Sequence, residues 1–89
     1  MIVEFDKSFS KSLDKIKDKK ILQRTREKIL ELEHSGSLQD IKNLKKLSGF
    51  KNYYRIRIGD YRLGFEQIDK NTIRLIILSH RKDIYKKFP

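Results

Sequence analysis

The sequence contains no cysteine and a single proline, which is its last residue, Pro89. Without cysteine the chain can form no disulfide, no thiol nucleophile and no zinc–thiolate centre. No apolar run approaches the roughly 20 residues of a membrane-spanning helix. The first residues also lack the basic segment and apolar stretch of a secretory signal peptide. We therefore expect a cytoplasmic protein with no membrane partner.

Acidic residues are few, because 12 Asp and Glu stand against 22 Lys and Arg, which gives the 89 residues a net charge of +10. Hydrophobic residues still make up 37%, and the four tyrosines and five phenylalanines are not typical of a disordered basic tail. A chain of this length has room for one thin core, so we expect a single domain over residues 1–89. The charge favours a polyanionic partner such as a nucleic acid, although excess lysine can also serve only solubility.

The N-terminal half is expected to form a strand and two helices. Residues 2–5 have the composition of a short strand. Apolar residues then recur at helical spacing over residues 9–16 and again over 21–32, which predicts two amphipathic helices in a hairpin. Asp18 is suited to cap the second helix, and Gly36 follows its end.

The C-terminal half is expected to be mostly strand. Residues 38–52 form a basic loop or a short strand. Three strand-like runs follow, at residues 53–58, 61–68 and 73–78. The last residues form a short helix or a tail. The order predicts the α+β class: an N-terminal strand, a two-helix hairpin and a three-stranded antiparallel array that form a small sheet.

A Gly-Asp dipeptide at residues 59–60 signals a two-residue hairpin turn. This turn sets Arg57 directly opposite Arg62. It also sets Arg55 opposite Gly64, whose missing side chain leaves space for another group to approach the sheet. Like charges in opposed positions destabilise a hairpin by roughly 0.2–1 kcal/mol, so the fold has no use for the arginine pair. The core face of this hairpin is expected to contain Tyr54, Ile56, Ile58, Tyr61, Leu63 and Phe65.

The next turn sets the register of the third strand. With residues 70–71 as the turn, the predicted pairs are Ile68 with Ile73, Glu66 with Leu75, Gly64 with Ile77 and Arg62 with Ser79. Arg81 then falls on the same face as Arg62, and Tyr85 is within reach of it. A four-residue loop is the alternative. The expected patch contains Arg55, Arg57, Arg62 and Arg81.

Four guanidinium groups on one face favour a phosphate site. Their planar forks match phosphate oxygens bidentately and stay charged at any working pH. A solvated outer face is the alternative, since arginine is common there. The directly opposed pair favours the phosphate site.

Three segments carry a resemblance to a known family. They are residues 47–49 (LSG), 54–63 (YRIRIGDYRL) and 79–85 (SHRKDIY). Together they resemble the RelE/ParE toxin superfamily, most closely the RelE-like mRNA interferases of type II toxin–antitoxin systems. The resemblance implies a ribosome-dependent endoribonuclease that cuts mRNA in the ribosomal A site without metal or cofactor. It also implies attack by the ribose 2′-hydroxyl and neutralisation by a cognate antitoxin.

The resemblance also implies roles for particular residues. Basic residues on the central strands activate the hydroxyl and stabilise charge, and a C-terminal tyrosine stacks on or orients the RNA. The positions that match are Arg55, Arg57, Arg62, Arg81 and Tyr85. Arginine stands at 55 and 57 where the family has lysine, and the interval from Arg81 to Tyr85 is short for the family. Because arginine is a poor general base, His80 is a further candidate for proton transfer, although the register sets it on the core side.

Further residues are suited to bind messenger or ribosomal RNA. These are Tyr53, Lys45, Lys46, Lys51 and Lys82. Lysines can equally be a solvated surface, as in the run at residues 15–20. The chain has two histidines and no paired carboxylates at useful spacing, so we expect no metal site.

Two other functions remain open from the sequence. A ParE-like toxin has the same fold and inhibits DNA gyrase, and it lacks the catalytic basic set. A non-catalytic RNA-binding module would show salt-sensitive binding and no cleavage.

Overall fold

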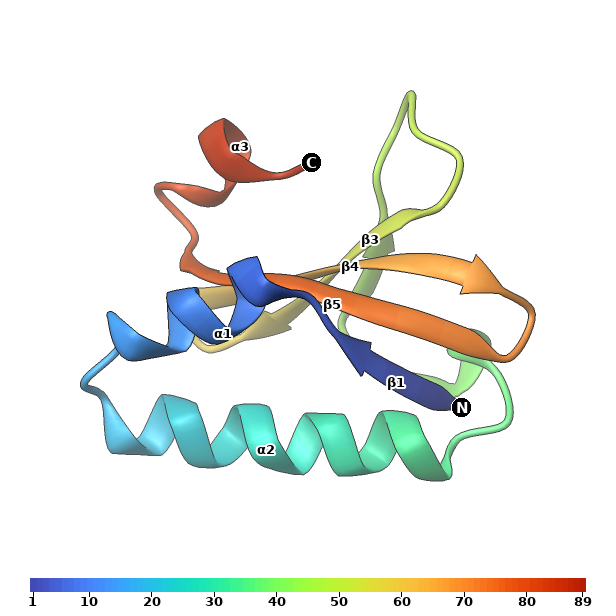
Figure 1. Cartoon of the computed structure of the whole chain (residues 1–89), viewed down its shortest axis with the longest axis horizontal. Coiled ribbons are helices and arrows are strands. Elements are labelled where there is room, and N and C mark those ends of the chain that lie inside the picture. The colour runs from blue at the N-terminus through green and yellow to red at the C-terminus, as the bar shows by residue number, and fades with distance from the viewer.

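The computed structural model describes residues 1–89 as an α+β fold built on one five-stranded sheet (Figure 1). Its elements are β1 (Ile2–Phe5), α1 (Lys7–Asp14), α2 (Lys19–His34), η1 (Leu38–Asp40), β2 (Leu44–Lys46), β3 (Tyr53–Ile58), β4 (Tyr61–Asp69), β5 (Thr72–His80) and α3 (Ile84–Lys87). The strand order is β1-β5-β4-β3-β2, with β1 parallel to β5 and the other pairs antiparallel. The predicted class and element order are confirmed. The basic segment contains a short strand, β2, and the chain ends in a short helix.

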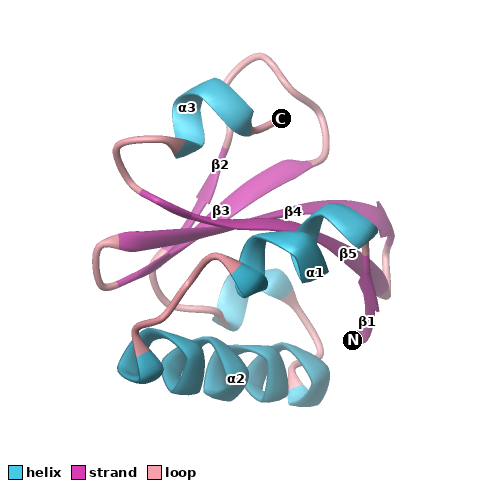
Figure 2. Ribbon diagram, turned by 60° about the vertical axis from the view of Figure 1, so that its left-hand side comes forward, coloured by secondary structure: helices cyan, strands magenta, loops and turns pink.

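The sheet has a covered face and an open face. Figure 2 shows α1 and α2 on one side of the sheet and α3 on the other. The covered face holds the core, in which Ile56, Leu63 and Phe65 are fully buried. Tyr54 and Tyr61, also predicted there, are half-buried against its margin. None of the helices has the length and apolar composition that crossing a membrane requires.

Aspartate side chains cap the N-termini of α1 and α2. Asp18 accepts hydrogen bonds from the backbone amides of Lys20 and Ile21 at 2.9 and 3.3 Å, which confirms the predicted cap of α2. Asp6 accepts one from the amide of Ser8 at 3.0 Å at the start of α1. Hydrogen bonds from the Ser8 hydroxyl and amide lower the pKa of Asp6 below its usual value. These bonds satisfy amide groups that have no partner within the helix.

The register between β3 and β4 is the predicted one. Arg57 lies opposite Arg62, and Arg55 lies opposite Gly64. The turn at residues 59–60 has Gly59 at a φ of 58°, a left-handed conformation that glycine adopts without strain. Local turn chemistry therefore sets the positions of the arginines across this hairpin.

The register predicted between β4 and β5 is confirmed near the turn at residues 59–60 and is wrong near the turn at residues 70–71. The observed pairs include Arg62 with Ser79, Gly64 with Ile77, Phe65 with Leu75, Glu66 with Arg74 and Gln67 with Ile73. The first two are those predicted. The pairs predicted for Glu66 and Ile68 are wrong.

Two bulges cause this difference. One bulge leaves Ile68 of β4 without a partner, and it shifts the register by one residue. The other leaves Ile76 of β5 without a partner and shifts the register back, so the pairs at Gly64 and Arg62 are those predicted. The carbonyl of Ile76 accepts a hydrogen bond from the Ser8 hydroxyl at 2.6 Å, which ties the second bulge to the start of α1. A pattern of period two cannot locate such an extra residue, because its partner is distant in the sequence.

Candidate active site

A basic pocket lies on the open face of the sheet. Alternate side chains of β3 point away from α1 and α2, and the facing positions of β4 point the same way. The pocket has a volume of about 400 Å³ and is lined by Asn43, Leu44, Lys45, Arg55, Arg57, Arg62 and Tyr85. Lys45 reaches it because β2 pairs Lys45 with Arg55. The structure thus brings together five of the residues predicted from the sequence.

Tyr85 reaches the pocket from α3. The Arg55 guanidinium carbon lies 4.7 Å from the centre of the Tyr85 ring, within the range of a cation–π contact. The residue is 73% exposed, so much of its surface remains open to a ligand. Hydrogen bonding to Arg55 and the charge of Arg55 lower the pKa of Tyr85, with smaller effects of Lys45 and Arg62. The site therefore favours the ionised form of this phenol.

The end of the chain holds α3 over the sheet. Ile84 and Phe88 are buried, and the ring of Phe88 packs directly on Gly64. A Cβ atom at position 64 would lie 2.8 Å from Phe88 Cδ2, which is too close for the present packing. The space predicted at Gly64 is therefore filled by the chain's own Phe88. This contact positions α3 so that Tyr85 meets Arg55.

The arginines in the pocket have no acidic partners. The ion pairs of the molecule involve Lys28, Arg74 and Arg81, and none involves Arg55, Arg57 or Arg62. Arg57 Nη2 lies 3.5 Å from the Asn43 side-chain oxygen. The pocket therefore holds uncompensated positive charge.

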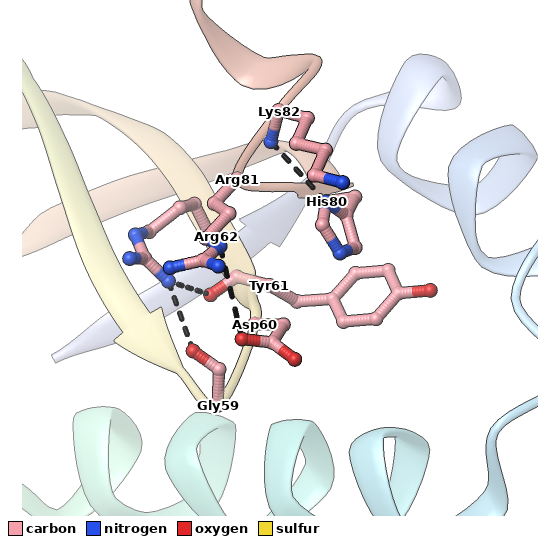
Figure 3. A network of polar contacts seen from close by, with 7 residues as sticks. All are labelled: Gly59, Asp60, Tyr61, Arg62, His80, Arg81 and Lys82. Carbon is pink, nitrogen blue, oxygen red and sulfur yellow. Dashed lines mark hydrogen bonds and ion pairs between the residues drawn. The ribbon is translucent and has the colours of Figure 1, made fainter.

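Arg62 is held by the hairpin turn. Its Nη1 donates to the carbonyls of Gly59 and Tyr61 at 3.0 and 2.9 Å (Figure 3). Arg81 lies beside it in the same view, with Nε 3.8 Å from Asp60 Oδ1. Arg81 is not part of the pocket lining, and its charge faces the carboxylate of Asp60.

His80 lies away from the pocket. Its ring packs edge to face on Tyr61 at 5.4 Å between centroids. Its Nδ1 accepts a hydrogen bond from the Lys82 amide at 3.2 Å. The ring lines a different cavity, on the side of the sheet that α1 covers, in agreement with the predicted register. His80 follows Ser79 directly before Arg81, and its ring does not join the arginines that line the pocket.

The other predicted RNA-binding residues are spread around this face. Tyr53 is half-buried, with its ring edge to face on Phe88 at 5.6 Å. Lys46 and Lys51 lie at the connection between β2 and β3, and Lys82 is exposed in the turn after β5. None of these three lysines lines the pocket.

The sequence reasoning missed Asn43 and Phe88. Asn43 has a φ of 64°, a conformation that asparagine tolerates better than most residues, and its carbonyl accepts from the Arg57 amide at 3.1 Å. An asparagine before a predicted strand is a weak signal for such a turn. For Phe88 the only available signal was the glycine on the arginine face, whose partner could not be identified.

The side chains in the pocket limit its chemistry. Its donors are guanidinium, ammonium and phenol groups, which suit the oxygens of a phosphodiester. No group of three or more His, Asp or Glu residues in the structure could hold a metal ion. The arrangement can bind a phosphate, stabilise charge that develops on it and place an aromatic ring beside it.

Comparison with known proteins identifies the class. The family model described as the ParE toxin of the type II toxin–antitoxin system parDE matches residues 3–85. The chain therefore belongs to the ParE/RelE family of type II toxins.

Within that family the chain is similar to RelE proteins. Toxin RelE3 of Methanocaldococcus jannaschii is 43% identical over 90 residues, which cover 100% of both chains. The crystal structure of the RelB–RelE antitoxin–toxin complex from Methanococcus jannaschii superposes with a TM-score of 0.80 at 40% identity, covering 97% of this chain and 99% of that one. The archaeal RelE–RelB complex from Pyrococcus horikoshii has a TM-score of 0.70 at 26% identity, covering 90% and 93%. The chain is thus a RelE-like toxin, which confirms the resemblance seen in the sequence.

Proposed function

We propose that the chain is a ribosome-dependent, metal-independent endoribonuclease that cleaves mRNA in the ribosomal A site. The observation that carries this proposal is the pocket in which Arg55, Arg57 and Arg62 lie together without a carboxylate, beneath the exposed Tyr85. A gyrase inhibitor has no need of such a site. The similarity to RelE3 supports the same activity.

The reaction forms a bond from the ribose 2′-oxygen to phosphorus and breaks the bond to the 5′-oxygen of the next nucleotide. Negative charge builds on the phosphorane between these steps. Arg55 and Arg57 bind the phosphate oxygens in this proposal, and Arg62 adds positive charge beside the turn. Arg81, which follows β5 outside the pocket lining and pairs with Asp60, contributes from the margin of the site. Removing one preorganised donor of this kind typically costs about 10²–10³ in rate.

Proton transfer needs a group other than arginine, which stays protonated. Tyr85 is the suitable group in the pocket, because Arg55 lowers its pKa and its ring can also stack on a base. The proposal assigns no proton-transfer step to His80, whose ring lies on the other side of the sheet.

A RelB-type antitoxin is the partner that we propose to neutralise the toxin in the cytoplasm. The related structures from Methanococcus jannaschii and Pyrococcus horikoshii are both complexes of RelE with RelB. A net charge of +10 on 89 residues favours an acidic segment in that partner.

The test is translation of a reporter mRNA in a cell-free system, with primer extension to map the ends. We expect cuts at codon-spaced positions when ribosomes are present and intact mRNA when they are absent. Arg55→Ala should slow cleavage about 10²–10³-fold, as expected for loss of one charge-stabilising donor. Arg26→Ala, a change on α2, is the matched control and should cleave like the wild type. Intact mRNA under both conditions would contradict the proposal.

The family description favours one second candidate, a ParE-like inhibitor of DNA gyrase. It predicts inhibited supercoiling by gyrase and no ribosome-dependent cuts. Supercoiling of a relaxed plasmid by gyrase, with and without the protein, separates the two functions.

A further inference from the structure

An aromatic row continues the open face beyond the pocket. Phe50 packs edge to face on Tyr53, with ring centroids 6.0 Å apart and planes at 84°. Tyr53 packs in the same way on Phe88, at 5.6 Å and 87°. Phe88 in turn rests on Gly64 of the sheet. The three rings therefore form a connected row that ends at Phe50.

Phe50 is presented to solvent by a loop whose base is held in place. The residue is 48% exposed, although a phenylalanine usually buries most of its ring. The Leu47 amide donates to the Tyr53 carbonyl at 2.9 Å, and the Asn52 carbonyl accepts from the Gln67 amide at 2.8 Å. Gly49 has a φ of 81°, which allows the chain to turn just before Phe50.

Positive charge surrounds this ring. Lys46 and Lys51 line the same shallow depression as Phe50, which has a volume of about 560 Å³. Both lysines are exposed and neither forms an ion pair. An aromatic ring between unpaired cations suits a base that stacks while its phosphates meet the lysines, as in proteins that bind single-stranded nucleic acids.

The row is aligned with the pocket. Tyr53 and Arg55 are two residues apart on β3 and point to the same face, which separates them by about 6.6 Å of strand rise. Arg55 lies against Tyr85, and Tyr53 contacts Phe50. A strand of RNA with one base on Tyr85 can therefore continue along the row to Phe50.

We propose that Phe50 is a second base-stacking residue, which binds a nucleotide flanking the one at Tyr85, with Tyr53 and Phe88 holding it in position. This inference rests on the proposed function, because it assigns a further contact to the same single-stranded RNA. Lys46 and Lys51 contact the phosphates on either side of that nucleotide.

The test uses short single-stranded RNA in which every 2′-hydroxyl is methylated, so that it cannot be cleaved. A fluorescent base, 2-aminopurine, replaces one base at a time, and its quenching reports stacking during titration with the protein. Phe50→Ala should weaken binding about 5- to 150-fold, the range expected for loss of one stacked base. It should also remove the quenching at one position. Phe50→Trp should keep the affinity and the quenching of the wild type, because it retains an aromatic face.

Two controls separate stacking from charge and from folding. Phe5→Ala removes a phenylalanine that is 56% exposed on β1, at the opposite edge of the sheet from β2, and should bind like the wild type. The slope of affinity against salt should stay unchanged in Phe50→Ala and fall in magnitude by about 0.7 in Lys51→Gln, which loses one phosphate contact.

The results distinguish this inference from the proposed function. Affinity for RNA in Phe50→Ala within twofold of the wild type overturns the inference, as does equal loss in Phe50→Trp. Loss of binding to a RelB-type antitoxin with unchanged RNA affinity also overturns it, because the row would then be a protein contact. Stacking that depends on Phe50, without cleavage on ribosomes, would instead contradict the nuclease proposal alone. Absence of any binding of this RNA by the wild type would overturn the inference alone, because the nuclease proposal requires RNA presented by the ribosome and is tested by the cleavage assay.

Discussion

At the scale of residues, arginines gather on the open face of the sheet, where their mutual repulsion does not stabilise the fold. Arg57 and Arg62 stand directly opposite each other, and neither has an acidic partner. Arg62 is compensated by two backbone carbonyls at the turn, whereas Arg57 has only a 3.5 Å contact with Asn43. Arg57 therefore carries the less compensated charge of the pair.

Arg57→Gln should separate stability from activity. Loss of the like charge should leave the free energy of unfolding unchanged or raise it by up to about 1 kcal/mol. Loss of a charge-stabilising donor should slow cleavage on ribosomes about 10²–10³-fold. Urea denaturation and primer extension measure the two effects, and Arg57→Lys, which keeps the charge, serves as control. A clear loss of stability in Arg57→Gln would show that the arginine supports the fold.

Tyr85 should ionise at a lower pH than an ordinary tyrosine. Its pKa lies below the ordinary value of 10.0 because Arg55 favours the phenolate. An absorbance titration should show a phenol that deprotonates below the ordinary tyrosine pKa, and that step should disappear in Tyr85→Phe. In Arg55→Gln the step should move up toward the ordinary pKa. A step that stays in place in Arg55→Gln would exclude the proposed contact between the two groups.

At the scale of elements, α3 decides whether the pocket is complete. The helix contains only four residues, and its position depends on the burial of Ile84 and Phe88 against the sheet. It carries Tyr85 to Arg55, while β3 and β4 carry the arginines. The site is thus assembled from a hairpin formed by local contacts and a helix held by distant ones.

Gly64→Ala should displace α3 without disrupting the hairpin. The added Cβ would lie within 3 Å of three atoms of the Phe88 ring, so the ring must move and Tyr85 moves with it. We expect reduced cleavage and a rise in the Tyr85 pKa toward its ordinary value, both measurable as above. Gly36→Ala is the matched control, because a Cβ at Gly36 meets nothing within 4 Å. An unchanged Tyr85 titration in Gly64→Ala would contradict the role given to Phe88.

At the scale of the whole molecule, charge and shape act together. The open face gathers arginines and lysines, while α1 and α2 cover the other side of the sheet (Figure 2). A net charge of +10 steers any polyanion toward the molecule, and the pocket selects where a phosphate binds.

Binding of single-stranded RNA should therefore depend on salt. If the four arginines each neutralise a phosphate, they should contribute about −3 to the slope of the logarithm of affinity against the logarithm of salt concentration. Arg62→Gln should reduce the magnitude of the slope by about 0.7, and Lys19→Gln at the start of α2 should leave it unchanged. Fluorescence titrations over a range of salt measure the slope. A flat dependence would exclude a phosphate site on this face.

Much of this arrangement follows from the sequence by itself. The Gly-Asp turn determines the register of β3 and β4, and so the opposed arginines, because a two-residue turn leaves one pairing that buries the apolar face. The caps and apolar spacing determine the helices in the same local way. Sequence motifs also identify the toxin family, which the comparisons confirm.

Only the tertiary structure decided the rest. The bulges at Ile68 and Ile76, the packing of Phe88 on Gly64 and the row that ends at Phe50 depend on contacts between segments far apart in the chain. A local pattern records which side chains are apolar or charged, and it carries no information on which distant group fills a given space. The pocket depends on local and on distant contacts. Neighbouring residues place its arginines, and the end of the chain folds back over the sheet and brings Tyr85 to them.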